Sequence, residues 1–342
     1  MKGGSIPDRA GPAGPPPTIP GGRTQHRAQE RAGSAGGEAA GPSGAPDLEI
    51  GQFSDPGRKR PNNEDWLGTF RPEDPARLAE KGNLFLLADG MGGHQAGEMA
   101  SRQAVDRVIR VYMEHQGRDV AAGLKRAVEA ANAALYASSG KLQQGQNSGT
   151  TLVAGVIRRG SLWVANVGDS RAYLLRRGSL EQISQDHSWA AAGERAGLGE
   201  DWAGRHVLTR ALGTRPQVEV DLFGPLPLEV GDRLILCSDG LTTPLSDAEI
   251  CDIAGRYRPQ KASEALVRAA NERGGPDNVS VLVAEVKGPG QAPRKVPAVP
   301  DLESLLARVG LRLSPALIAA VILGAMILVG LGFALGLLLF GQ

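Results

Sequence analysis

The chain has 342 residues, of which 22% are charged, and its formal net charge is +1. This length allows one large domain with additional segments, and a nearly neutral chain without a basic stripe does not indicate nucleic-acid binding. Two cysteines, Cys237 and Cys251, lack the spacing of zinc ligands and indicate a reducing compartment, with Cys237 expected in a buried strand.

Residues 1–46 are rich in Gly, Pro and Ala and show no apolar periodicity. Such a segment cannot bury enough surface to offset its ordering entropy, so we predict a disordered N-terminal region. No apolar stretch follows Lys2, which argues against a signal peptide. Residues 47–287 alternate strand-like and helix-like segments, and we predict that they form the folded domain.

The domain begins with a cationic cluster that is followed by two acids. Arg60 precedes Asn63, Glu64 and Asp65 in this run. A solvated polar loop is one interpretation. In the other, the Arg60 guanidinium binds a phosphate and the two acids hold metal-bound water.

Four aspartates each adjoin an apolar run that is typical of a buried β-strand. They are Asp89 after residues 84–88, Asp169 after 162–167, Asp239 after 234–237, and Asp277 before 279–283. A carboxylate at the end of a buried strand is costly unless something neutralises it. Any one of these aspartates could be a turn residue. Together they could converge on hard divalent cations, which take oxygen ligands.

Small residues after Asp89, in the run Gly90-Met91-Gly92-Gly93-His94, allow the backbone to turn sharply. The Gly90 carbonyl could therefore join Asp89 as a metal ligand. His94 is either a proton donor to a leaving group or a solvated loop histidine. A helix is expected from about residue 95 to residue 115.

The motifs that follow are turn signals when taken singly, but their order and spacing form a specific set. They comprise Arg60-x-x-Asn63-Glu64-Asp65, Asp89-Gly90-Met91-Gly92-Gly93, Ser148-Gly149-Thr150-Thr151, Gly168-Asp169-Ser170-Arg171, Ser238-Asp239-Gly240 and Asp277-Asn278. The set resembles the metal-dependent Ser/Thr protein phosphatases of type 2C, in their compact bacterial form. The resemblance covers roughly residues 50–286.

The resemblance implies an α+β fold, an α-β-β-α sandwich of two antiparallel sheets flanked by helices, with a site for two Mn²⁺ or Mg²⁺ ions. Asp89 would bridge both metals, the Gly90 carbonyl would bind one, and Asp239 and Asp277 would complete the other site. Asp169, with Asp239, matches the position of a third metal. By the same resemblance, the catalytic residues are Arg60, which grips the phosphate, and Glu64 and Asp65, which act largely through water.

Two departures from the family pattern leave the general acid open. Met91 follows the Asp89-Gly90 pair, where many eukaryotic relatives have a histidine close by, and His94 lies further on. Between residues 187 and 207 lies the flap that the family uses beside its active site. It contains Trp189, Glu194, Arg195, Asp201 and Trp202, which could tune substrate choice.

Two cations held close together would lower the pKa of a bridging water, and the resulting hydroxide would attack phosphorus in line. A cysteine-dependent phosphatase would need an arginine six residues after its nucleophile. Position 243, six after Cys237, is threonine, which argues against that route.

Residues 288–314 are expected to form a linker and a juxtamembrane segment, followed by an uncharged apolar run over 315–340. As a helix, residues 316–340 would extend ~37 Å, enough to cross a bilayer core of ~30 Å. A buried core helix is the alternative. Basic residues precede the run (Arg294, Lys295, Arg308, Arg312), which predicts a single-pass inner (cytoplasmic) membrane protein whose domain faces the cytoplasm.

Gly332 and Gly336 have the spacing of a helix-dimer motif, although glycine is also common in membrane helices.

These observations predict a membrane-tethered phosphatase that removes phosphate from Ser and Thr of cytoplasmic proteins. The resemblance suggests Ser/Thr kinases and their targets as partners. One alternative is a catalytically silent, membrane-bound phosphopeptide-binding adaptor on the same scaffold. Another is a related phosphatase acting on an anti-sigma-factor antagonist.

Overall fold

The computed structural model describes residues 44–93, 95–139, 148–189 and 207–290. Its strands are β1 (Gly44–Asp55), β2 (Asp65–Phe70), β3 (Asn83–Met91), β4 (Gly149–Thr150), β5 (Leu152–Arg158), β6 (Ser161–Val167), β7 (Arg171–Arg176), β8 (Ser179–Gln182), β9 (Asp221–Pro227), β10 (Arg233–Cys237) and β11 (Val279–Gly290). Its helices are α1 (Pro75–Lys81), α2 (Gln95–Glu114), α3 (Val120–Ser139), α5 (Asp239–Thr242), α6 (Asp247–Arg256) and α7 (Pro259–Glu272).

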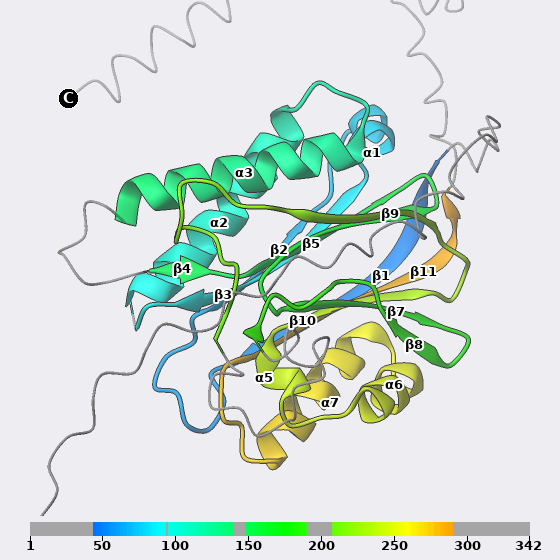
Figure 1. The fold of residues 1–342 in the computed structure, drawn as a ribbon. Helices are drawn as coiled ribbons and strands as arrows, with labels where there is room; N and C mark the ends of the chain where they lie inside the picture. The colour runs from blue at the N-terminus through cyan, green and yellow to red at the C-terminus, as the bar shows by residue number, and fades with distance from the viewer. Residues whose placement is uncertain (1–43, 94, 140–147, 190–206, 291–342) are drawn as a thin grey trace, which may run out of the picture. The chain divides into compact units, whose positions relative to one another are not determined.

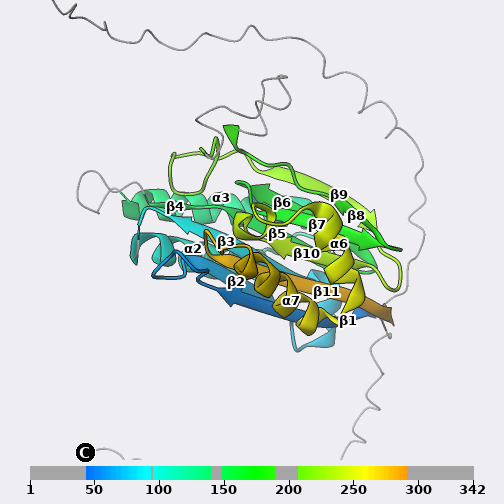
Figure 2. The same ribbon diagram turned by 90° about the horizontal axis from the view of Figure 1, so that it is seen from below.

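The strands form two antiparallel sheets, which confirms the predicted pair of sheets flanked by helices. One sheet has the order β1-β11-β10-β7-β8. The other has the order β2-β3-β5-β6-β9, with β4 paired to β3. Helices α2 and α3 cover the outer face of the β2–β9 sheet, and α5, α6 and α7 cover the outer face of the other (Figure 1). Viewed from below, α6 and α7 cross that second sheet (Figure 2).

Three apolar clusters fill the three interfaces between these four layers. Along β3, Leu84, Leu86 and Ala88 pack towards α2 and α3, whereas Phe85 and Leu87 pack between the two sheets. Successive side chains of a strand point to opposite faces, so a continuous apolar run is what a strand covered on both faces requires. The same alternation occurs in β10 and β11.

The sheet extends slightly beyond the predicted domain limits of 47 and 287, because Gly44 in β1 pairs with Gly290 in β11. No helix among residues 44–93, 95–139, 148–189 and 207–290 is long and apolar enough to span a membrane. The predicted disordered region 1–46 lies outside the described residues up to position 43, and the predicted membrane helix 315–340 lies wholly outside them.

Candidate active site

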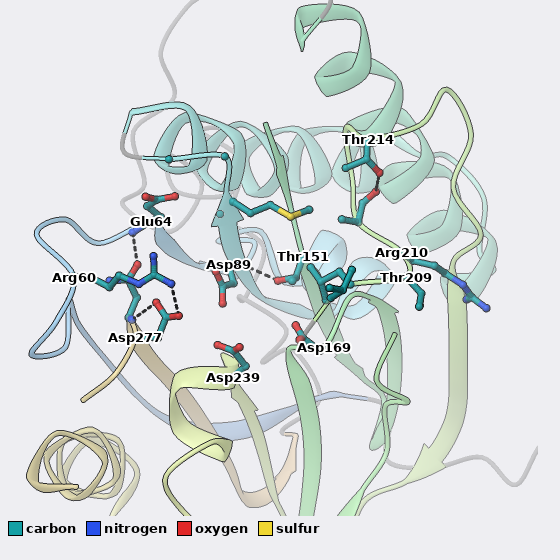
Figure 3. Close-up of a pocket in the computed structure, with 18 of the residues that line it drawn as sticks. Arg60, Glu64, Asp89, Thr151, Asp169, Thr209, Arg210, Thr214, Asp239 and Asp277 are labelled. Carbon is teal, nitrogen blue, oxygen red and sulfur yellow. Dashed lines mark hydrogen bonds and ion pairs between the residues drawn. The ribbon is translucent and has the colours of Figure 1, made fainter. Parts of the chain in front are cut away.

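The ends of several strands from both sheets meet at one open pocket of about 610 Å³. Figure 3 shows Asp89, Asp169 and Asp239 facing one another across this pocket, with Asp277 and Arg60 to one side. The pocket is also lined by Glu64 and Gly90. Six of the seven charged residues predicted for the site therefore line one cavity, and the seventh, Asp65, is buried and lies opposite Asp89 in the β2–β3 pairing.

Asp89 is positioned by the strand ends on either side of it. Its backbone N–H donates to the Thr151 hydroxyl at 2.9 Å, and its carbonyl accepts from the Thr150 hydroxyl at 2.8 Å and from the Thr151 N–H at 2.9 Å. The Thr151 hydroxyl also bonds Ser170 at 2.7 Å within the protein interior. The two threonines thus connect the Asp89 strand to the Asp169 turn.

Asp65 is the first residue of β2 and lies opposite Asp89 in the antiparallel register. It is only 5% exposed, so the solvated-loop interpretation does not hold for this residue. The Ser238 hydroxyl donates to Asp65 Oδ2 at 2.8 Å. Ser238 is the N-cap residue of α5, yet its hydroxyl makes no capping bond to that helix. The Ser238 hydroxyl instead stabilises the Asp65 carboxylate.

Asp239 begins the short helix α5, whereas the sequence pattern placed it at the end of a strand. The strand β10 ends two residues earlier, at Cys237. The following Gly240 packs against β11 so closely that a Cβ there would lie 2.0 Å from the Asn278 carbonyl oxygen. This close approach brings Asp239 alongside the residues that begin β11.

Arg60 and Asp277 form an ion pair, with Arg60 Nη2 2.8 Å from Asp277 Oδ2. The loop that carries Arg60 is held by the side chain of the buried Asn278. Asn278 Nδ2 donates to the carbonyls of Pro56 at 2.9 Å and Asn62 at 2.8 Å, and its Oδ1 accepts from the Glu64 N–H at 2.9 Å. One amide side chain therefore links the start of β11 to the loop before β2.

Glu64 lies against the start of α2. The Glu64 carbonyl accepts from the Ser101 hydroxyl at 2.6 Å and from the Gly90 N–H at 3.1 Å. A Cβ at Gly97 would lie 1.9 Å from Glu64 Oε2, and a Cβ at Gly90 would lie 2.2 Å from the Gly97 carbonyl oxygen. Two glycines thus allow β3, α2 and Glu64 to approach one another.

Burial and mutual repulsion raise the pKa of three of these carboxyl groups, Asp65, Asp89 and Asp169. Burial, helped by the charges of Asp239 and Asp277 and opposed by hydrogen bonds from Ser280 and Ser238, raises the pKa of Asp65 to about 7. Burial, and then the charge of Asp65, raises the pKa of Asp89 well above its usual range. Burial also raises the pKa of Asp169 to about 7, with a contribution from Asp239. Carboxylates in such a setting favour a cation as neighbour.

The donor set fits hard divalent ions, since it consists of carboxylate oxygens and a carbonyl. Within the part of the chain that the structure describes, no three Asp, Glu, His or Cys side chains are placed to hold an ion by themselves. Asp277 Oδ2 accepts a hydrogen bond from the Arg60 guanidinium at 2.8 Å. Carbonyl and water ligands would complete any coordination sphere here.

Asp169 follows Gly168, which has a φ of +112° and lies so close to Thr151 that a side chain would clash. The turn is fixed by the buried His187, whose Nδ1 accepts from the Gly168 N–H at 3.1 Å. Asp221 accepts a hydrogen bond at 3.0 Å from His187 Nε2 and one at 2.6 Å from Arg210 Nη1. Residues at both ends of the predicted flap thus support the Asp169 turn.

Several predicted contributors lie outside the described residues. These are the general-acid candidate His94 and the flap residues Glu194, Arg195, Asp201 and Trp202. Trp189, at the described end of the flap, is 42% exposed. Cys237 is buried as predicted, and burial raises the pKa of its thiol to about 12, which disfavours a thiolate nucleophile.

The roles of Ser238, Asn278, Gly97 and His187 were not predicted from the sequence. Each acts through a partner far along the chain, such as Asp65 for Ser238. Gly97 had a usable signal, because an isolated glycine inside a helical pattern often marks a close packing contact.

A protein-family model and several known proteins match this chain. The family model described as Protein phosphatase 2C matches residues 65–274. A serine/threonine phosphatase, stp, from Listeria welshimeri is 36% identical over 244 residues, covering 68% of this chain and 93% of that protein. The serine/threonine protein phosphatase PstP of Mycobacterium tuberculosis is also 36% identical, covering 70% of this chain and 45% of that protein.

Solved structures agree with the sequence relatives. The catalytic domain of PstP, solved in complex with two manganese ions, has 34% identity and a TM-score of 0.60, covering 70% of this chain and 98% of that chain. The serine/threonine phosphatase of S. agalactiae has 31% identity and a TM-score of 0.64, covering 70% of this chain and all of that chain.

Proposed function

We propose, from the premise that this chain belongs to the protein phosphatase 2C family of serine/threonine phosphatases, that it hydrolyses phosphoserine and phosphothreonine of cytoplasmic proteins with two divalent ions. The observation that carries the metal dependence is the convergence of Asp89, Asp239 and Asp169 on one pocket (Figure 3). A relative solved with two manganese ions supports Mn²⁺ as the metal, and Mg²⁺ is the family's alternative.

Asp89 and the Gly90 carbonyl would hold one ion, and Asp89, Asp239 and Asp277 the other. Asp169 would contribute to a third. When bound, the two ions supply the nucleophile, a hydroxide shared between them, and offset charge on the phosphoryl oxygens. The reaction consumes one water and releases inorganic phosphate and the Ser or Thr hydroxyl.

Arg60 would bind the substrate phosphate. Its bond to Asp277 uses Nη2, and a guanidinium has further N–H donors in a planar fork that matches phosphate oxygens. The ion pair with Asp277 therefore orients Arg60 at the pocket edge. Glu64 and Asp65 would act on the metal-bound waters, Glu64 from the pocket wall and Asp65 from its buried position opposite Asp89.

The decisive experiment is hydrolysis of p-nitrophenyl phosphate and of a phosphothreonine peptide by the full chain. We expect turnover with Mn²⁺ and loss of at least about 100-fold in EDTA, restored by adding Mn²⁺. Activity that EDTA leaves unchanged would contradict the metal mechanism. A protein that binds the phosphopeptide but hydrolyses neither substrate would instead be the silent adaptor.

The arrangement of the whole chain is a further part of this proposal. The residues before β1 would form a disordered region and the residues from β1 to β11 the catalytic domain, followed by a linker up to residue 314 and a membrane helix over 315–340. The uncharged run and the basic residues before it support an anchor in the inner membrane with the domain in the cytoplasm. Ser/Thr kinases and their targets would then be its partners.

A further inference from the structure

We propose that Arg215 forms a subsite for an anionic group carried by the substrate close to the phosphate that is removed. The group would be an aspartate, a glutamate or a second phosphate. This inference rests on the proposed function, because it concerns how a phosphoprotein lies in the same pocket.

Arg215 lines the pocket that contains Asp89 and Asp239. Figure 3 shows Arg60 on one side of the aspartates and Thr214, the neighbour of Arg215, on the other. A peptide that places its phosphate between Arg60 and the aspartates must extend across the pocket surface. Arg215 is therefore within the region that residues flanking the phosphate can contact.

The backbone that carries Arg215 is held by a buried polar side chain. Asn132, which is 1% exposed, donates through Nδ2 to the carbonyls of Arg215 at 3.0 Å and Pro216 at 3.3 Å. Its Oδ1 accepts from the Gly213 N–H at 2.9 Å. All three bonds fix the turn at Gly213–Pro216. The exposed Arg215 side chain is therefore attached to an ordered backbone.

Charge distinguishes Arg215 from the other arginines of the pocket. Arg60 is paired with Asp277. Arg210 is paired with Asp221 at 2.6 Å and with Glu219 at 3.2 Å. Arg215 is exposed, and its guanidinium makes no ion pair or hydrogen bond with another residue that the structure describes.

A guanidinium without a neighbouring acid offers its full charge and its donor fork to a ligand. Carboxylates and phosphates match that fork in bidentate geometry. Because the site is exposed, we expect a moderate and salt-sensitive preference, about 3- to 10-fold in kcat/KM.

The test uses phosphothreonine peptides in which one aspartate is moved through the three positions on each side of the phosphothreonine. Matched peptides carry alanine, lysine or a second phosphothreonine at the same position. The measured quantity is the ratio of kcat/KM for the acidic peptide to kcat/KM for its alanine counterpart. We expect this ratio to exceed about 3 at one or two positions and to fall in high salt. A preference confined to the doubly phosphorylated peptide would identify a second phosphate as the ligand.

Two variants assign the preference to Arg215. In Arg215→Gln the ratio should fall to about 1, and in Arg215→Glu the preference should reverse towards the lysine peptide. The reversal is a gain that damage to the fold cannot produce. The matched control is Arg126→Gln, which removes one exposed charge from α3 and should keep the wild-type ratio.

The proposal is overturned if the wild-type ratio is about 1 at every position for both the aspartate peptides and the doubly phosphorylated peptides, or if Arg215→Gln retains the preference. It is also overturned if Arg126→Gln lowers the ratio to about 1, as Arg215→Gln should, because the net charge of the protein would then be the cause. These outcomes all require measurable hydrolysis. No hydrolysis of any peptide or of p-nitrophenyl phosphate in Mn²⁺ would instead contradict the proposed function.

Discussion

The carboxylates of the pocket carry opposite consequences for stability and for function. Asp65 and Asp89 face each other across the β2–β3 register, and burial disfavours the charged form of both. In the metal-free protein, repulsion between these carboxylates destabilises the fold, whereas a divalent ion bound by them would offset their charge. Individual charges at this site can therefore be tested by both turnover and stability.

Replacing Asp239 with asparagine should lower kcat for p-nitrophenyl phosphate by about 100-fold or more, because a neutral amide holds a divalent ion poorly. Manganese affinity, measured by titration calorimetry, should fall as well. The matched control is Asp252→Asn, which changes an exposed acid on α6 that pairs with Arg256. Near-normal turnover in Asp239→Asn would remove this residue from the metal site.

Stability of the metal-free protein should decrease as pH rises from about 4 to about 7. The pKa of Asp65, like that of Asp169, is about 7 in the folded chain against an ordinary value of 3.8. Across that window the unfolded chain has lost a proton that the folded chain retains, so unfolding becomes easier as pH increases. Urea denaturation in EDTA at pH 5 and pH 7.5 measures this difference.

Saturating Mn²⁺ should abolish the trend, because bound ions stabilise the ionised acids. The variant Asp65→Asn should reduce it in EDTA. A metal-free protein that is equally stable at both pH values, or more stable at pH 7.5, would show that these carboxylates do not share a buried environment.

Elements meet at the site through contacts that tolerate little change. The loop before β2 is tied to β11 by Asn278, and β3 approaches α2 through Gly90 and Gly97. Short helix α5 approaches the start of β11 through Gly240. Each of these contacts fixes the distance between two elements, either through hydrogen bonds to a loop or through a glycine that leaves no room for a side chain. The position of each acidic residue therefore depends on how its strand, helix or loop packs.

Asn278→Ala should lower the free energy of unfolding by about 3 kcal/mol, since three hydrogen bonds of a buried amide are lost at about 1 kcal/mol each. Activity should decrease too, because the loop that carries Arg60 and Glu64 loses its anchor. Asn62→Ala is the control on the same loop. It keeps the backbone carbonyl that Asn278 binds, and chemical denaturation should show a change within about 0.5 kcal/mol.

Gly97→Ala should reduce kcat by about 10- to 100-fold, because a Cβ there must displace the Glu64 carboxylate. Gly255→Ala is the matched control, since the space around a Cβ on α6 is open. In that helix, alanine should raise the free energy of unfolding by about 0.5–1 kcal/mol and leave kcat unchanged. If Gly97→Ala also leaves kcat unchanged, the contact between α2 and Glu64 is unimportant for turnover.

At the scale of the whole molecule, the two sheets bring acids from distant parts of the chain to one end of the sandwich. Asp89 belongs to the sheet of β2–β9, and Asp277 precedes β11 in the other sheet. The apolar layer between the sheets holds these strand ends together. The proposed C-terminal anchor would attach this site to a membrane.

Removing all residues after Pro300 should release the protein from membranes while retaining phosphatase activity, because the sequence after that point contains the uncharged run 315–340. Fractionation of cells that express each form measures the distribution. Residues 301–342 fused to a soluble reporter should be sufficient to direct it to the membrane fraction. A truncated protein that still pellets with membranes would contradict the anchor.

The sequence by itself determined which strands are buried on both faces, since uninterrupted apolar runs such as residues 84–88 require covered sheets. The spacing of the motifs also indicated the family and the acids at the site. Only the tertiary structure decided that Asp239 begins a helix, that Asp65 is buried beneath Ser238, and that Arg60 pairs with Asp277. These features depend on contacts between residues as far apart as 217 positions, which local periodicity does not encode.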